Sequence, residues 1–201
     1  GSTPLHLACR RACHLAPEGN GGMGTYDAAV IRALADAAGA GALTSADDEG
    51  RTPFHVACRY KASPDVLAEL ADSDGGADSL LIRDTEGHAP LGVYCRHAND
   101  YHGLQVLVSR CPDAAAAMGD GRQLPLHRIL STFNLAVNID CLRLIGNAYP
   151  RGLDSTDSRG MTPLALLCES YRAPLNVDIP KLRRGRTTLE RCLSKKIWLM
   201  A

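Results

Sequence analysis

The chain has 201 residues, of which 22 are basic and 22 acidic, so its formal net charge is zero when histidine is neutral. Apolar residues make up 45% of the sequence and charged residues 22%, a composition typical of folded proteins and unlike that of disordered chains or strongly basic nucleic-acid binders. No apolar run approaches the roughly 18 residues of a membrane-spanning helix. We therefore expect a folded chain that neither crosses a membrane nor binds nucleic acid.

A seven-residue phrase recurs five times along the chain. Its copies begin at residues 3, 52, 89, 124 and 162 and read TPLHLAC, TPFHVAC, APLGVYC, LPLHRIL and TPLALLC. The prolines of successive copies are separated by 49, 37, 35 and 38 residues. Three nearly equal intervals indicate a structural repeat, and the longer first interval contains a glycine-rich segment.

Each copy of the phrase predicts the start of a helix. Proline is favoured in the first turn of a helix, threonine before it is a good N-cap, and a histidine three residues after the cap can reach back to it. The apolar residues that follow have helical spacing, as in Phe54, Ala57 and Cys58. Turn signals rich in aspartate and glycine precede four copies, at residues 47–50, 84–87, 119–121 and 157–160.

A second helix is predicted after each of the first four copies. Apolar residues three and four positions apart mark these segments, as in Leu104, Leu107 and Val108. Pro112 and Pro150 follow the third and fourth segments, where proline commonly stands just past a helix end. The predicted second helices are residues 26–38, 65–71, 101–111 and 138–148.

The order of turn, Thr-Pro-Leu-His helix and second helix resembles the ankyrin repeat, whose period is about 33 residues. Copies one and two match the phrase closely, whereas Ala89, Gly92, Leu124 and Ala165 depart from it. The resemblance implies an all-α solenoid of about five stacked helix-turn-helix repeats, because one helix pair cannot bury its apolar face alone. The expected repeats are residues 1–46, 47–82, 83–117, 118–154 and 155–201 of a single domain.

Two features that suggest chemistry are better explained by the repeat. GNGGMG at residues 19–24 fits a dinucleotide-binding pattern, but no βαβ context surrounds it, so residues 17–25 are interpreted as an insertion. A shared slot of the phrase holds cysteine in four copies, which predicts small buried side chains too far apart for a disulfide or a common zinc ion. These are Cys9, Cys58, Cys95 and Cys168. We expect no metal, cofactor, small-molecule substrate or catalytic site, and hence not an enzyme.

Basic residues follow the phrase at matching offsets in the first three copies. Stacking would align them into a basic ridge that receives an acidic peptide or protein surface, with a merely solubilising face as the alternative. The candidate partner-binding residues, including two from the adjoining turns, are Arg10, Arg11, Arg51, Arg59, Lys61, His88, Arg96 and His97.

A second basic segment occupies residues 180–201, where seven basic side chains accompany one acidic side chain. It is interpreted as a solvated terminal segment. A nuclear-import signal, a kinase site and a contact for an acidic partner are the alternatives.

The resemblance implies a protein–protein interaction module that binds its partner through a concave face and the turn tips. The alternative is the regulatory array of a larger enzyme, such as a kinase or ubiquitin ligase, whose catalytic part lies outside these residues. No secretory signal is recognisable, and unpaired thiols suit a reducing compartment, so we expect an intracellular protein, cytoplasmic or nuclear.

Overall fold

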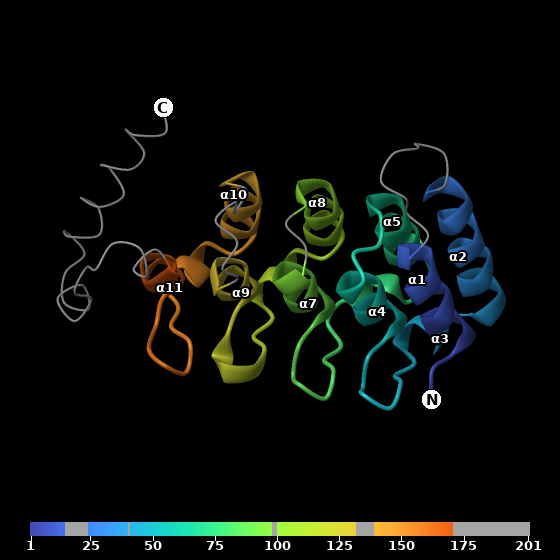
Figure 1. Cartoon of the computed structure of the whole chain (residues 1–201), viewed down its shortest axis with the longest axis horizontal. Coiled ribbons are helices and arrows are strands. Elements are labelled where there is room, and N and C mark those ends of the chain that lie inside the picture. The colour runs from blue at the N-terminus through green and yellow to red at the C-terminus, as the bar shows by residue number, and fades with distance from the viewer. Residues whose placement is uncertain (15–23, 40, 98–99, 132–138, 171–201) are drawn as a thin grey trace.

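A computed structural model of the chain describes residues 1–14, 24–39, 41–97, 100–131 and 139–170 (Figure 1). Every regular element in these ranges is a helix, and no strand occurs among them. The predicted all-α class is therefore confirmed for this part of the chain. The insertion expected at residues 17–25 and the basic segment 180–201 lie largely or wholly outside the described residues.

The first row of helices begins at the prolines of the repeated phrase, as predicted. Neighbouring helices of this row pack against one another in chain order (Figure 1). Proline suits these positions because its fixed φ matches the helix and its missing N–H would be unpaired there anyway. The row consists of α1 (Pro4–His14), α4 (Pro53–Arg59), α7 (Pro90–His97), α9 (Pro125–Ser131) and α11 (Pro163–Ser170).

A second row lies along the first, and each of its helices packs against the preceding first-row helix (Figure 1). The predicted boundaries agree with the observed ones to within two residues. The largest difference is at the start of α2, which begins at Gly24 rather than residue 26. The row consists of α2 (Gly24–Ala38), α5 (Pro64–Asp72), α8 (Tyr101–Arg110) and α10 (Ile139–Ala148).

Five short helical segments in the connections were not predicted from the sequence. Each spans three to five residues, which is too short to show apolar periodicity. Four of them lie between a second-row helix and the next turn, and the one at residues 120–122 lies within a turn. They are α3 (Gly41–Thr44), α6 (Gly76–Ser79), η1 (Pro112–Ala116), η2 (Asp120–Arg122) and η3 (Pro150–Leu153).

The predicted turns project side by side from the first row (Figure 1). Each is closed by a backbone hydrogen bond of 2.8–2.9 Å, from the N–H of residue 47, 84, 119 or 157 to the carbonyl four residues later. Gly50 has a φ of +69°, and a Cβ atom there would lie 2.9 Å from the backbone nitrogen of Thr85 in the next turn. Glycine at residue 50 therefore permits both the turn and the close approach of its neighbour.

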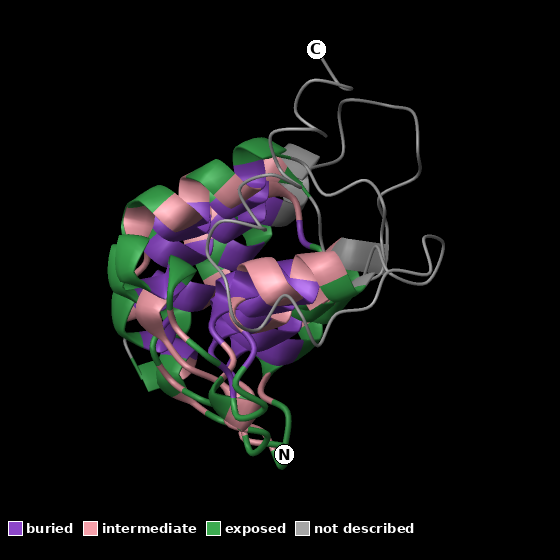
Figure 2. Ribbon diagram, turned by 90° about the vertical axis from the view of Figure 1, so that its left-hand side faces the viewer, coloured by how far each residue is buried: buried purple, intermediate pink, exposed green. Residues whose placement is uncertain are grey.

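The core lies between the two rows (Figure 2). The first-row helices α4 and α9 are buried at every position except their last. Leucine, alanine, valine and isoleucine dominate the core, with Phe54 and Tyr94 as its largest fully buried side chains. Cys9, Cys58 and Cys95 are at most 2% exposed, so the shared cysteine slot is a packing position in three of its four copies. Burial raises the pKa of Cys95, which keeps this thiol protonated.

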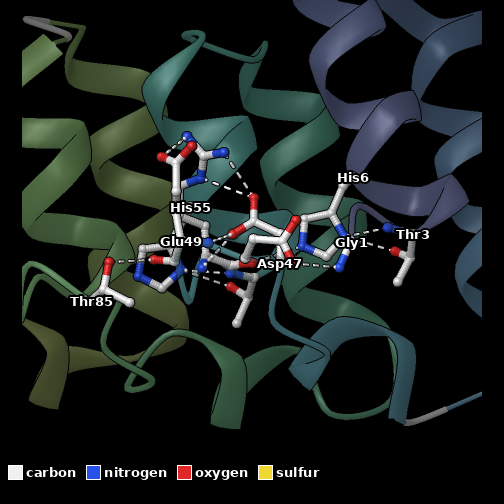
Figure 3. Close-up of polar contacts among 10 residues, drawn as sticks. Gly1, Thr3, His6, Asp47, Glu49, His55 and Thr85 are labelled. Atoms are coloured by element: carbon white, nitrogen blue, oxygen red, sulfur yellow. Dashed lines mark hydrogen bonds and ion pairs between the residues drawn. The ribbon is translucent and has the colours of Figure 1, made fainter.

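Three histidines of the phrase each link the start of their own helix to the turn of the next repeat. The Nδ1 atoms of His6, His55 and His127 accept hydrogen bonds of 3.1–3.3 Å from the backbone N–H three residues earlier. Their Nε2 atoms contact the carbonyls of residues 51, 88 and 161 at 2.7, 2.8 and 3.2 Å. Because Nδ1 accepts, Nε2 carries the proton and donates. Figure 3 shows the imidazoles of His6 and His55 at two of these helix starts. The hydroxyl of Thr3 lies 2.7 Å from the Nδ1 atom of His6, as expected for a capping residue.

The turns themselves are also linked, but not at every junction. Both the backbone N–H and the hydroxyl of Thr85 donate to the carbonyl of Glu49, at 3.1 and 2.8 Å (Figure 3). The N–H of Ser158 donates to the carbonyl of Gly121 at 2.7 Å. No backbone hydrogen bond joins the turn at 84–88 to the turn at 119–123, both of which are fully described. This junction also lacks a histidine link, because Gly92 stands in the histidine position of α7.

Candidate binding site

Four of the eight candidate residues come together in one pocket. Arg51, Arg59, His88 and Arg96 line an opening between the turns and the first-row helices α4, α7 and α9. The empty space of the pocket, including solvent at its mouth, is about 330 Å³. The rest of the lining consists of His55, Asp84, Glu86, Val93 and Arg128.

The other four candidates do not line this pocket. Arg10 and Arg11 are on α1, one helix farther along the row, with exposed or largely exposed side chains. Lys61 is exposed just after α4. The side chain of His97 lies outside the described residues. The structure thus brings together candidates from the second and third copies of the phrase and leaves those of the first copy outside the pocket.

Arg51 and His88 differ from the expectation of exposed partner-binding residues. The Arg51 guanidinium is held by the Asp47 carboxylate at 2.8 Å and by Glu49 at 2.6 Å. Burial would raise the pKa of Asp47, but hydrogen bonds from the side chain and backbone of Arg51 hold it below its usual range. His88 is buried, with only 5% of its surface exposed. Both side chains therefore form part of the pocket wall and are not exposed groups that a partner would contact first.

Arg59 and Arg96 match the expectation. They are exposed near the carboxyl ends of neighbouring helices α4 and α7, six residues after the proline in each copy of the phrase. No ion pair within the described part of the chain involves either guanidinium. Both charges at the pocket rim are thus available to an incoming group.

Arg128 is the residue that sequence reasoning missed. It lies on α9 at a position that is Leu7, Val56, Val93 or Leu166 in the other four copies. Its side chain is buried, with 9% of the residue surface exposed, and no carboxylate pairs with it among the described residues. A charged residue in a repeated apolar slot is the signal that would have identified it.

Two glycines lie beside Arg128 and the neighbouring histidine. A Cβ atom at Gly92 would meet nothing nearer than the Arg128 Cδ atom, at 3.9 Å. A Cβ atom at Gly119 would lie 2.8 Å from the His88 ring. The other described turns carry aspartate at the position of Gly119. Glycine at position 119 therefore leaves the space that the His88 ring occupies, and glycine at position 92 lies at contact distance from Arg128.

His88 connects Arg128 to two carboxylates. The Arg128 Nη2 atom contacts His88 Nε2, and because arginine only donates, this ring nitrogen is the acceptor. The Nδ1 atom then carries the proton and faces Glu86 at 3.4 Å and Asp84 at 3.7 Å. Burial, and next the Arg128 charge, lower the pKa of His88. The imidazole is therefore neutral near pH 7.

The Arg128 guanidinium keeps unused hydrogen-bonding capacity. Its Nε atom is buried without an acceptor in the described part of the chain. Burial, followed by the nearby charge of Arg96, lowers the pKa of Arg128, which shows that the cation is poorly compensated where it lies. Arg51 is paired with Asp47 and Glu49 outside the lining, so the pocket presents three arginines without a carboxylate partner, Arg59, Arg96 and Arg128, and two carboxylates, Asp84 and Glu86.

Hydrogen-bond donors and positive charge make this a site suited to binding an anion. Within the described residues, no group of three or more histidine, cysteine, aspartate or glutamate side chains is arranged to hold a metal ion. None of the helices in that part of the chain combines the length and apolar character needed to cross a bilayer. No family model matches the sequence, and no curated protein matches it either.

Proposed function

We propose that the chain is an ankyrin-repeat interaction module that binds an acidic peptide or surface of another protein. Support for the repeat comes from five in-phase copies of the phrase and from the two rows of helices that they begin. Further support comes from the histidine links, which recur in three copies at equivalent atoms. The partner would contact the first-row helices and the turn tips, where the pocket opens.

The observation that carries this proposal is the convergence of unpaired arginines from successive helix pairs. Arg59 and Arg96 are exposed at one rim, and Arg128 lies deeper between them and the turns. Exposed charges of one sign speed association with an oppositely charged partner and select against basic surfaces. The net charge of the chain is zero, so its overall charge adds no attraction for an acidic partner.

Quantitative affinity capture tests the proposal. The wild-type chain, the Arg59→Glu/Arg96→Glu variant and an Arg143→Glu control are each immobilised and exposed to the same cell extract. Arg143 is exposed on α10, in the second row, and serves as a matched control for charge reversal. We expect a discrete protein that the wild type and control retain and that the double variant retains at least tenfold less.

Direct titration of the captured protein then completes the test. Its affinity should fall steeply with added salt for the wild type and only weakly for the double variant. Circular dichroism should show the same helix content in all three proteins. Equal capture by wild type and double variant, with both folded, would contradict the proposed binding surface.

A further inference from the structure

We propose that the pocket around Arg128 is a specific oxyanion site, which accepts one carboxylate or phosphate group at the Arg128 guanidinium. The inference rests on the proposed function only for the source of that group, an acidic or phosphorylated side chain of the partner protein. Carboxylate and phosphate groups each present a pair of oxygen atoms that can accept two parallel hydrogen bonds from a guanidinium.

The first argument is the state of Arg128 itself. A buried guanidinium normally pairs with a carboxylate, because an uncompensated buried charge is costly. Here one nitrogen contacts neutral His88 and Nε has no acceptor among the described residues. A bound oxyanion would supply both the missing charge and the missing acceptor.

The second argument is that the departures from the repeated pattern coincide. Arginine replaces an apolar residue at position 128, glycine replaces histidine at position 92, and glycine replaces aspartate at position 119. All three changes meet at the same junction: Gly92 lies next to the Arg128 side chain, and Gly119 leaves space for the His88 ring. The turn aspartate that Gly119 replaces would also have added a negative charge beside the pocket.

The third argument concerns the acidic residues in the lining. Asp84 accepts a hydrogen bond from the backbone N–H of His88 at 2.8 Å, and both Asp84 and Glu86 face the His88 ring. They lie across the imidazole from the guanidinium and hold the ring in the tautomer that accepts from Arg128. Arg128 lines the pocket, and its buried Nε atom has no acceptor among the described residues.

The test uses the chain as it is, with inorganic phosphate, acetate and chloride as probes at constant ionic strength and pH 7.5. The readout is the ¹H–¹⁵N resonance of the Arg128 Nε–H group, assigned by its loss in Arg128→Leu. We expect a saturable shift with phosphate or acetate, and a much smaller one with chloride. Phosphate binding well above acetate binding points to a phosphorylated partner, and the reverse points to aspartate or glutamate.

Melting temperatures provide a second readout that does not depend on the resonance. A ligand that binds only the folded state raises the melting temperature with its concentration. The rise with phosphate or acetate should disappear in Arg128→Leu, weaken at least tenfold in apparent affinity in Arg128→Lys, and persist in Arg143→Leu. Glu86→Gln should strengthen it, because this change removes a competing negative charge.

Two results would overturn the inference. One is a wild-type resonance and melting temperature that respond equally to all three anions. The other is a response that survives in folded Arg128→Leu. Either result leaves the proposed interaction function standing if capture still depends on Arg59 and Arg96. Conversely, suppose that the chain binds the anion while no captured protein depends on Arg59 and Arg96. That result would refute the proposed function and leave the oxyanion site standing.

Discussion

At the scale of single residues, the most unusual feature is a charge in a position built for an apolar side chain. Arg128 shares its place in the phrase with leucine and valine, and 9% of its surface is exposed. Replacing poorly compensated buried charges by apolar residues is often neutral or stabilising. We therefore expect Arg128 to lower the stability of the fold, which suggests that its guanidinium serves binding and not packing.

Arg128→Leu is expected to raise the free energy of unfolding by about 1–2 kcal/mol, because it removes a buried charge and restores the residue type of the slot. Urea unfolding in anion-free buffer measures this change. Arg143→Leu, at an exposed position on α10, should change stability by less than about 0.5 kcal/mol. A loss of stability in Arg128→Leu would show that the His88 contact outweighs the burial of the charge.

Buried histidines should make the fold sensitive to acid. Burial lowers the pKa of His55, His88 and His127, so the unfolded chain binds protons more readily than the folded one. Their contribution to stability is complete above the unfolded pKa of about 6.5 and is lost as the pH falls below it.

We therefore expect the free energy of unfolding to decrease between pH 7 and pH 5, by at most about 1.4 kcal/mol per pH unit for each histidine. Urea unfolding at pH 7.5, 6.5 and 5.5 checks this slope. Asp47 and Asp157, whose pKa values are lowered, add a further loss only below about pH 4. Constant stability from pH 7.5 to 5.5 would contradict the buried neutral state of the histidines.

At the scale of helices, the local chemistry of the phrase accounts for most of what was predicted. Proline, a capping residue and apolar spacing located the starts of the first-row helices, because these signals act within one turn. Second-row ends shifted by one or two residues, as at Cys111, where the last turn is decided by packing. The short connecting helices have no local signal of their own.

The candidate site was less accessible from sequence for a different reason. Arg59 and Arg96 repeat at one offset and were found by that regularity. Arg128 breaks the regularity, and its meaning depends on Gly92 and Gly119, which lie 36 and 9 residues away in the chain. Only the stacking of α7 on α9 shows that these departures compensate one another.

This compensation predicts a strong coupling between two substitutions. Gly92→His/Arg128→Val restores the phrase on both helices and allows an imidazole to reach the carbonyl of Gln123, as His55 reaches that of His88. We expect the double variant to be about 1–2 kcal/mol more stable than the wild type, because glycine within a helix costs about 1 kcal/mol. Gly92→His alone should be less stable than the double variant, because Arg128 occupies the adjacent space.

Urea unfolding of the wild type, both single variants and the double variant provides the measurement. Additive effects within about 0.5 kcal/mol would show that the two positions do not compete for space. They would also remove the structural argument that Gly92 serves Arg128.

At the scale of the whole molecule, each helix pair packs mainly against its immediate neighbours. Such arrays respond to damage locally, because stability is a sum of units and their interfaces. Leu107 is fully buried on α8, in contact range of the neighbouring second-row helices α5 and α10. It is a suitable place to observe how far a defect spreads.

Leu107→Ala should cost about 2–5 kcal/mol. Native-state hydrogen exchange should show the largest loss of protection in α8, a smaller loss in α5 and α10, and the smallest in α1. Leu81→Ala, at an exposed leucine, is the matched control and should leave exchange unchanged. A uniform loss over all helices would mean that the array unfolds as one cooperative unit.

The missing backbone link between the turns at 84–88 and 119–123 has a mechanical consequence. Spreading the neighbouring turns breaks hydrogen bonds at Glu49 or Gly121, whereas spreading these two breaks none between backbone groups. At this joint the side chains of Arg128 and His88 provide a polar contact, and we expect the joint to open more easily than those with a backbone link. A group bound at the guanidinium would lie at this joint, and we expect its binding to change the tilt between the helix pairs on either side.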